Sequence, residues 1–444
     1  MQGLPPATRR VVWALLALAL CVRLAFIAAT PNYTPVHDDH DYDRLACAIV
    51  DGDGYPSVGP PTPPGTCVKS DSVARPTAYR PPAYPIALAG VYAAVAPLHL
   101  DRWTSARVAQ ALVGTLVAGL IGIVAGLVWG RPAGLAALAL AAVHLPFAMV
   151  GASLVSETLF LAFELGAVAC ALVAGRSERR WRWIVATGVL AGLAWLTRSN
   201  GLLLLLPLSI AAWSALRPRG RRAATLAVVA LLAAAAVTIS PWTIRNERSL
   251  HGFVPVATEV GPTLAGTYND VSRLDPVDPG AWWLPRQVPA IRAVVARHPA
   301  EPARDRILTR MALGYMVAHP LYVVHVVARN TLRLAELTPP SDWRAAGAGM
   351  DMPAAAGVLT SAWFWIVLAL AVAGIATGAA RRAPRFLWLL AVLMYLSAAV
   401  VISGVRFRMP LEPFVVMLAG VALVHFASPV LDLGRRLPHH IMRG

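Results

Sequence analysis

The chain has 444 residues, of which 57% are hydrophobic and 14% charged, whereas a soluble globular domain carries about 25% charged residues. Several apolar runs approach or exceed the ~20 residues that cross a bilayer as a helix, so a soluble protein is excluded. The net charge of +16 does not indicate nucleic acid, because it is nearly all arginine, scattered between apolar runs. Such clusters are typical of membrane-protein loops beside anionic headgroups. The composition therefore predicts an all-α polytopic membrane protein.

Ten apolar runs are expected to span the membrane. They are 11–29, 104–128, 132–150, 156–174, 183–197, 201–215, 223–241, 360–379, 386–402 and 410–427. The run 83–98 is short, follows Arg80-Pro81-Pro82 and has a proline inside each end, which favours a re-entrant or juxtamembrane helix. The first run follows Arg9 and Arg10 but lacks a clean small-residue cleavage site, so it is expected to remain as the first span.

With 83–98 excluded, the arginine-rich turns all fall on one side of the membrane. These arginines are Arg131, Arg176, Arg179, Arg180, Arg182, Arg217, Arg219, Arg221, Arg222, Arg381, Arg382 and Arg385. The positive-inside rule then places both termini in the cytoplasm. We expect a multi-pass protein of the cell (plasma) membrane with its active site on the extracytoplasmic face.

This topology divides the chain into five expected parts. They are a first transmembrane helix (1–30), a first extracytoplasmic loop with a juxtamembrane helix (31–103), transmembrane helices two to seven (104–241), a large extracytoplasmic loop (242–359), and transmembrane helices eight to ten with a cytoplasmic tail (360–444). Part of 242–359 is amphipathic and is expected to lie on the membrane surface, although a further pair of spans there stays open. Cys47 and Cys67 lie in the first loop, where they either form a disulfide or remain two free thiols.

Ionisable side chains gather at the outer ends of the predicted spans, where such groups are costly and mark function. The stretch His37-Asp38-Asp39-His40-Asp41-Tyr42-Asp43 holds four aspartates. The other charged residues at these ends are Arg80, Glu157, Arg198, Arg245, Arg406 and Arg408. Arginines bind phosphate through bidentate, charge-assisted hydrogen bonds, and a carboxylate can take a proton from a hydroxyl or bind a divalent cation. The pattern indicates transfer from an anionic lipid-linked donor. Taken singly, the acids could be solvated or cap helices, and the arginines could reach out of the membrane to the headgroups.

Six segments, in this order, resemble the GT-C membrane glycosyltransferases that use polyprenyl-phosphate sugars. They are HDDHDYDRLACAIVDGDGY, RPPAYPIALAG, SET, LTRSNGLLLLLP, SPWTIRNERSLHGFVPVATEVG and VRFRMPLEPFVVMLAGVAL. The nearer relatives would be the protein O-mannosyltransferase-like group (glycosyltransferase family 39-like) and the lipid A aminoarabinose transferases. The resemblance implies a GT-C-like fold of about ten transmembrane helices, a re-entrant or juxtamembrane helix and two large extracytoplasmic loops.

The resemblance, together with the positions of polar residues at the outer ends of the predicted spans, also suggests roles for individual residues. Asp38 would be the general base, with Asp39 and Glu157 orienting the acceptor, while Asp41 and Asp43 are expected to be solvated neighbours. The donor phosphate would be held by Arg80, Arg198, Arg245, Arg406 and Arg408. The acceptor or sugar would contact Tyr42, Tyr84, Asn200 and Asn246. Asp38 and Asp39 would also be the ligands of a divalent cation (Mg, Mn or Zn), but Arg80 replaces the Glu that ligates metal in some relatives, which puts the metal in doubt.

The expected function is transfer of a sugar from a polyprenyl-phosphate donor to a hydroxyl of a lipid, glycan or protein acceptor. The transfer would proceed with inversion on the extracytoplasmic face. The alternative is a transporter or flippase of a lipid-linked or anionic solute, which predicts charges near the middle of spans, broken helices and paired repeats. The span interiors are expected to be nearly free of charge, which favours the enzyme. A non-catalytic assembly protein with the same fold stays open.

Overall fold

The computed structural model describes residues 5–57, 75–339, 344, 347, 350 and 352–436. Within these residues all regular elements are helices, and one isolated antiparallel bridge joins Pro56 and Pro76. The predicted all-α class is confirmed.

Nine of the ten predicted spans correspond each to one continuous helix or helical run, and the tenth is broken. The continuous ones are α1 (Pro6–Ala28), α4 (Arg102–Trp129), α7 (Glu157–Ala174), α8 (Arg180–Thr197), η2 (Ser199–Leu204) with α9 (Leu205–Leu216), α10 (Arg221–Leu250), α17 (Ala354–Ala376), α18 (Arg385–Ala399) and α19 (Glu412–Arg436). The predicted span 132–150 consists of α5 (Arg131–Ala142) and α6 (Leu145–Ala152), with a bend of 50° between them.

The described residues contain six helices that are long and apolar enough to cross a membrane, or up to eight if each of two bent pairs is one span. The remaining predicted spans are helices shorter or less apolar than that, α18 and the first part of α19 among them. The second bent pair is α14 (Glu301–Ala318) with α15 (Pro320–Leu334), which meet at 102° within the predicted outer loop. A broken span and a re-entrant hairpin both remain compatible with this pair.

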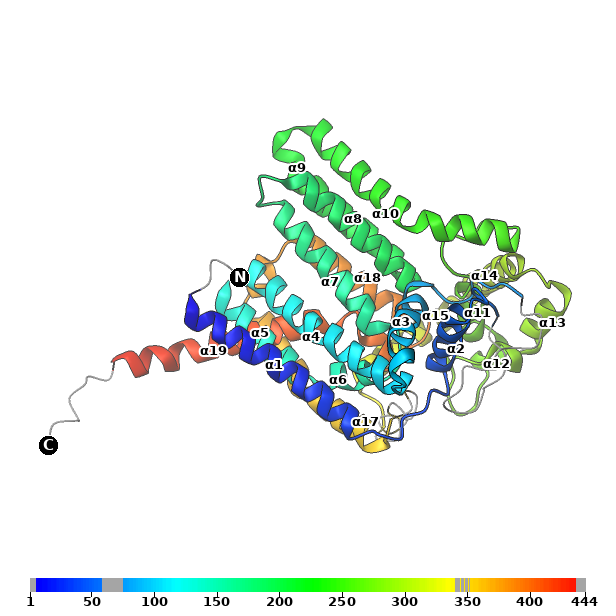
Figure 1. The fold of residues 1–444 in the computed structure, drawn as a ribbon, viewed down its shortest axis with the longest axis horizontal. Helices are drawn as coiled ribbons and strands as arrows, with labels where there is room; N and C mark the ends of the chain where they lie inside the picture. The colour runs from blue at the N-terminus through cyan, green and yellow to red at the C-terminus, as the bar shows by residue number, and fades with distance from the viewer. Residues whose placement is uncertain are drawn as a thin grey trace.

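The long helices lie side by side, and the arginine-rich turns between them meet at one end (Figure 1). The Trp129 indole donates to the carbonyl of Ala379 at 2.9 Å, which joins the end of α4 to the turn before α18. Arg176 donates to the carbonyl of Leu127 at 2.6 Å, so the turn after α7 lies at this same end. The grouping follows from helices that alternate in direction, as the predicted topology requires.

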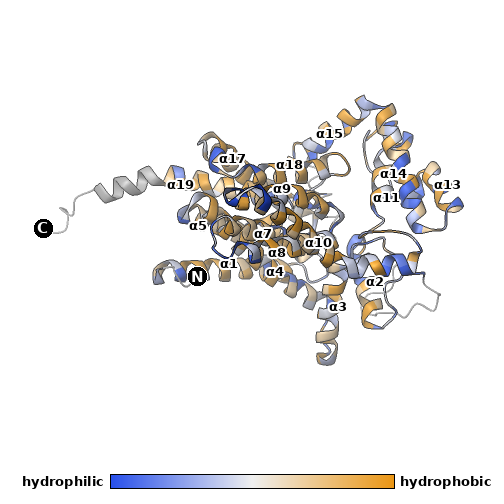
Figure 2. Cartoon of the chain, turned by 90° about the horizontal axis from the view of Figure 1, so that it is seen from above, coloured by the Kyte–Doolittle hydropathy of each residue, from blue (hydrophilic) through white to orange (hydrophobic). Residues whose placement is uncertain are grey.

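The opposite end of the bundle carries a layer of shorter helices (Figure 1). They are α2 (Asp38–Val50), α3 (Ala83–Val95) with η1 (Ala96–Leu98), α11 (Val260–Thr267), α12 (Asp270–Arg273), η4 (Pro285–Gln287), α13 (Pro289–Arg297), α14 and α15. Helix α3 projects sideways from the bundle (Figure 2), as a juxtamembrane helix would. Residues of α11, α13, α14 and α15 share a small apolar core, and Glu259 to Leu334 thus form a compact cap at this end.

The described cysteines lie both in the bundle of long helices and in the layer of shorter helices. Cys21 on α1 and Cys170 on α7 are free. Cys47 is buried on α2 and takes part in a disulfide. Its predicted partner, Cys67, lies outside the described residues, and the pairing therefore stays a prediction.

Glycines let two of the long helices approach closely. A Cβ atom added to Gly188 on α8 would lie 2.3 Å from the carbonyl oxygen of Leu231 on α10, and one added to Gly192 would lie 2.8 Å from the Cβ of Thr238. Glycines four residues apart occupy one face of a helix, and small residues at such spacing are typical of tightly packed membrane helices. The α8–α10 contact therefore depends on backbone packing, and it fixes the end of α8 where Arg198 follows.

We predict that Gly188→Ala destabilises the protein by about 1–3 kcal/mol, the usual effect of overpacking. The new methyl group meets backbone of α10, which cannot move alone. The measurement is the thermal unfolding midpoint of the detergent-solubilised protein. Gly90→Ala on α3 is the matched control, because nothing lies within 4 Å of its added Cβ. Equal midpoints for the two variants would contradict this packing.

Candidate active site: an arginine–carboxylate network at one end of the bundle

The acid-rich stretch forms the first turn of α2, and one of its acids organises the turn itself. The Oδ1 atom of Asp39 accepts backbone N–H groups of His37 at 2.9 Å and His40 at 3.0 Å. Its Oδ2 atom accepts the Tyr33 hydroxyl. Asp39 is 2% exposed, and both of its oxygens are engaged within the turn. It therefore positions Asp38 and does not face the same space.

Asp38 bridges two arginines that come from opposite sides of the site. Its Oδ1 atom accepts from Arg80, which precedes α3, and its Oδ2 atom accepts from Arg406 at 2.6 Å. Arg406 lies in η6 (Arg406–Arg408), between α18 and α19. The Tyr55 hydroxyl donates to the carbonyl of Arg80 at 2.9 Å, which holds the backbone there.

Glu157 forms the floor of the same network. It is the first residue of α7, it is fully buried, and its Oε1 atom accepts from Arg198 and from Arg406, each at 2.5 Å. Arg198 also donates to the hydroxyl of Ser156 at 3.2 Å. The Oε2 atom of Glu157 has no hydrogen-bond partner among the described residues. Arg406 thus joins Asp38 of α2 to Glu157 of α7.

Two further carboxylates complete the network, and neither was predicted to belong to the site. Asp41 accepts from Arg80 at 2.8 and 3.1 Å, and was expected to be solvated. Glu259, which precedes α11, lies 3.5 Å from Arg80 and accepts the Ser199 hydroxyl at 2.6 Å. Glu259 belongs to the segment VPVATEVG that contributed to the resemblance. Its place could not be inferred from spacing, because the path of the long outer segment is set by tertiary contacts.

The neighbouring arginines favour the ionised form of Asp38. Burial alone would raise the pKa of Asp38, but the charges and hydrogen bonds of Arg80 and Arg406 outweigh burial, and the pKa lies well below its usual range. Burial likewise opposes the charge of Arg406, yet Glu157 and Asp38 raise its pKa well above the ordinary value. Three arginines face four carboxylates, Asp38, Asp41, Glu157 and Glu259. The network therefore holds one negative charge in excess.

Tyrosines line the network on the α2–α3 side. The rings of Tyr42 and Tyr84 pack edge to face with centroids 5.0 Å apart, and the Arg80 guanidinium lies 5.6 Å from the Tyr42 ring. Burial is the main cause that raises the pKa of Tyr42 to about 12, so its hydroxyl stays protonated. The buried Tyr84 hydroxyl has no partner within the described part of the chain. The Tyr42 hydroxyl lies 3.4 Å from that of Ser156, so of the two tyrosines Tyr84 is the one whose hydroxyl is left to hydrogen-bond a bound molecule.

Asp43 differs from its expected role. It is 4% exposed and accepts from Arg102 at 3.0 and 3.1 Å, from the Tyr92 hydroxyl at 2.6 Å and from the Trp103 indole at 2.9 Å. The expectation of a solvated residue is wrong, because the α2 helix turns Asp43 toward α3 and α4. Asp43 therefore anchors α2 against the bundle.

Four other predicted site residues lie outside the network. Arg245 donates to the carbonyls of Thr77 and Tyr55, and Asn246 donates to those of Val254 and Val256, so both tie loops together. Asn200 donates to the Ser397 hydroxyl at 3.3 Å. Arg408 is buried in a second ionic cluster. That cluster contains Arg408, Glu412, Glu336 and His144.

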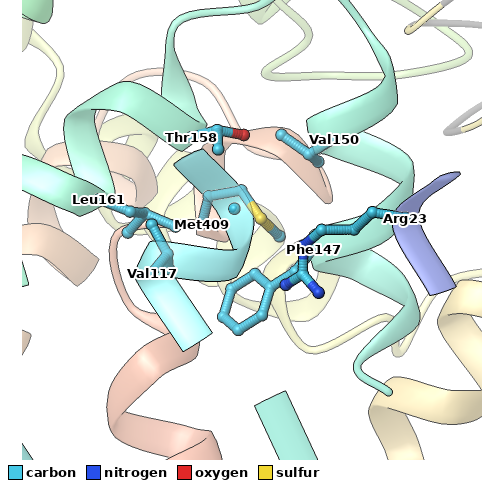
Figure 3. A pocket seen from close by; sticks show the side chains of 8 residues that line it. Arg23, Val117, Phe147, Val150, Thr158, Leu161 and Met409 are labelled. Carbon is cyan, nitrogen blue, oxygen red and sulfur yellow. The ribbon is translucent and has the colours of Figure 1, made fainter. Parts of the chain in front are cut away.

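Charged side chains are buried inside predicted spans, contrary to the expectation of nearly charge-free interiors, and Arg23, Arg107 and Glu164 are examples. Arg23 of α1 donates to the carbonyls of Ala19, Ala141 and Ala142, and so binds carbonyls that the break after α5 leaves free. It borders a small cavity that Phe147, Thr158 and Met409 also line (Figure 3). Glu164 is fully buried in α7 without a hydrogen-bond partner in the described residues. Arg23 is accounted for by helix packing, whereas no role for Glu164 follows from its surroundings.

The predicted metal ligands do not fit a divalent cation. Both oxygens of Asp38 are held by guanidinium groups, and both oxygens of Asp39 are engaged within the turn. In the part of the chain that the structure describes, no group of three or more His, Cys, Asp or Glu residues could hold a metal ion. Arginines therefore surround Asp38 at the position that a cation would occupy.

Comparison with known families finds a match in part of the chain. Residues 80–244 match the family model of dolichyl-phosphate-mannose-protein mannosyltransferases. This segment contains Arg80, Glu157 and Arg198 of the network. No curated protein matches the sequence significantly.

Solved structures resemble the chain over nearly its whole length. The oligosaccharyltransferase AglB from Archaeoglobus fulgidus, in complex with an inhibitory peptide and a dolichol-phosphate, is 14% identical with a TM-score of 0.56, and the match covers 98% of this chain and 52% of that one. The same archaeal enzyme in complex with Zn and sulfate is 15% identical, with a TM-score of 0.52 and coverages of 95% and 51%. ArnT from Cupriavidus metallidurans bound to undecaprenyl phosphate is 16% identical, with coverages of 97% and 81% but a TM-score of 0.41.

These comparisons establish the fold. The chain has the fold of GT-C membrane glycosyltransferases, which confirms the fold class that the sequence motifs implied. It spans about half the length of the archaeal oligosaccharyltransferase chains.

We predict that Asp43→Asn lowers the stability of the folded protein by roughly 3–5 kcal/mol, the usual result of removing one member of a buried ion pair. Arg102 would lose its charged partner, and α2 its anchor. The thermal unfolding midpoint in detergent is the measurement. Asp51→Asn is the matched control, since Asp51 is exposed at the end of α2. A midpoint for Asp43→Asn equal to that of the control would show that this anchor does not stabilise α2.

Proposed function

We propose that this protein is a membrane glycosyltransferase that transfers a sugar from a polyprenyl-phosphate donor to an acceptor hydroxyl. The observation that carries the proposal is the meeting of Arg80 and Arg406 with Asp38, and of Arg198 and Arg406 with Glu157, at one end of a GT-C bundle. Such a site combines phosphate-binding groups with a carboxylate that can accept a proton. The match to the mannosyltransferase family model over 80–244 supports the same chemistry.

The three arginines would bind the donor phosphate. A sugar-phosphate-lipid carries one negative charge, and the departing lipid phosphate carries nearly two. Guanidinium groups aimed at the phosphate therefore stabilise the transition state more than the bound donor, which is the requirement for catalysis. Arg198 and Arg406 are well placed for this role, because buried Glu157 fixes both of them. Arg245 and Arg408 would act indirectly, by holding the surrounding backbone.

Asp38 would be the general base. The acceptor hydroxyl attacks the anomeric carbon while its proton passes to Asp38, and the electron pair of the breaking bond passes to the phosphate oxygen. A single displacement of this kind inverts the anomeric configuration. Asp39 supports Asp38 through the turn, and Glu157 supports the arginines.

The acceptor and sugar would lie beside the tyrosines. Tyr42 and Tyr84 offer hydroxyls at the edge of the network, and Asn200 lies at the start of η2, next to Ser199. Glu259 adds a partly exposed carboxylate that can accept hydrogen bonds from sugar hydroxyls. The acceptor would be a lipid, a glycan or a protein.

The protein would act in the cell (plasma) membrane. The arginine-rich turns lie at the end of the bundle opposite the network, and the positive-inside rule favours the cytoplasm for that end. Both termini would then be cytoplasmic, and the site would face the extracytoplasmic side. Donor lipid would enter from the outer leaflet.

The test is sugar transfer in vesicles that contain the full chain and a radiolabelled polyprenyl-phosphate sugar. We predict that Asp38→Asn lowers turnover at least about 100-fold, the usual contribution of a general base, with normal folding. Asp51→Asn should keep wild-type turnover. Wild-type-like turnover in Asp38→Asn would reject Asp38 as the base. If the wild-type protein moved the donor between leaflets without releasing its sugar, the transporter alternative would replace the enzyme.

A further inference from the structure

We propose that Asp38 occupies the phosphate-binding position in the donor-free protein, and that the donor phosphate binds by displacing Asp38 from Arg406. This inference rests on the proposed function and adds a regulatory step to the same site. The exchange would free the base only when a donor is bound.

The hydrogen bonds of the network already engage every nitrogen of Arg80 and two nitrogens of Arg406, whereas the Nε atom of Arg198 has no partner among the described residues. The Nε, Nη1 and Nη2 atoms of Arg80 contact Asp41, Glu259 and Asp38. The Nε atom of Arg406 donates to Glu157 and its Nη2 atom donates to Asp38. A phosphate that takes the N–H groups now directed at the carboxylates, including the Nε and Nη2 donors of Arg406, must displace a carboxylate from them.

The charge balance points to the same exchange. The four carboxylates already exceed the three arginines by one charge. An added phosphate would bring a further negative charge into a partly buried site, where like charges repel strongly. The most favourable response is for one carboxylate to move out of contact.

Asp38 is the carboxylate best able to move. Its side chain is 29% exposed, whereas that of Glu157 is 0% exposed and fixed at the start of α7. Of the three arginines, Asp41 and Glu259 contact only Arg80, so their departure would leave Arg406 occupied. Opening the Asp38–Arg406 pair frees a guanidinium nitrogen and leaves the buried Glu157–Arg406 pair intact.

The exchange would couple binding to catalysis. A carboxylate held between two guanidinium groups is a weak base, because both charges favour its ionised form. Once released from Arg406, Asp38 binds a proton more readily and faces the bound donor. The acceptor hydroxyl would therefore be activated only in the donor complex, which predicts an ordered reaction in which the donor binds first.

The test is the affinity of the full-length protein for farnesyl phosphate, a short polyprenyl phosphate without sugar. We predict that Asp38→Asn binds this probe roughly tenfold more tightly than the wild type, within the range usual for coupled equilibria, although it is inactive in transfer. Asp41→Asn is the matched control, because it removes one charge beside the same Arg80 but leaves the Asp38–Arg406 pair in place. Its gain should be clearly smaller.

The outcomes separate this inference from the proposed function. Equal gains in Asp38→Asn and Asp41→Asn would reduce the effect to net charge and overturn the displacement of Asp38. Weaker or unchanged binding in Asp38→Asn would also overturn it, and sugar transfer by the wild type would then still support the glycosyltransferase. Absence of both transfer and probe binding in the wild type would overturn both proposals.

Discussion

The site depends on the ion pairs that Arg406 forms with two carboxylates. Arg406 pairs with Asp38, 368 positions away in the chain, and with Glu157, 249 positions away. The long helices bring these three segments to one end of the bundle, and the guanidinium then holds α2 and α7 at a fixed separation. Buried ion pairs contribute little net stability, because desolvation of the charges opposes their attraction. A dense group of them at one end of the bundle is therefore better explained by ligand binding than by folding.

Two arginines of one short helix serve different purposes. Arg406 faces the network, whereas Arg408 turns into the bundle, where it pairs with Glu412 at 2.6 Å and Glu336 at 3.0 Å. Arg408 and its partners thus hold η6 on the side that faces the bundle, while Arg406 on the same short helix faces the site. The network is held on the other side by Asp43, which ties α2 to Arg102 of α4. Asp38 lies between these two fixed attachments, and it is the side chain that must move in the proposed exchange.

Much of the fold could be predicted from the sequence, because apolar runs and arginine-rich turns report directly on a bilayer. The run 83–98 was predicted to be a juxtamembrane or re-entrant helix and not a span, and α3 does project sideways from the bundle (Figure 2). The break between α5 and α6 and the burial of Arg23 could not be predicted, since both depend on contacts between helices. Within the site, Asp38, Arg80, Glu157 and Arg406 were predicted as candidates and lie together. Glu259, and the opposite directions of Arg406 and Arg408, depend on tertiary structure and short-range backbone geometry.

Both proposals require that a lipid phosphate binds among Arg80, Arg198 and Arg406. The most direct measurement is an experimental structure of the full chain with farnesyl phosphate. We expect phosphate density within hydrogen-bond distance of Arg406, with the Asp38–Arg406 pair open and the Glu157–Arg406 pair closed. Phosphate density at another place, with the Asp38–Arg406 pair still closed, would contradict this expectation.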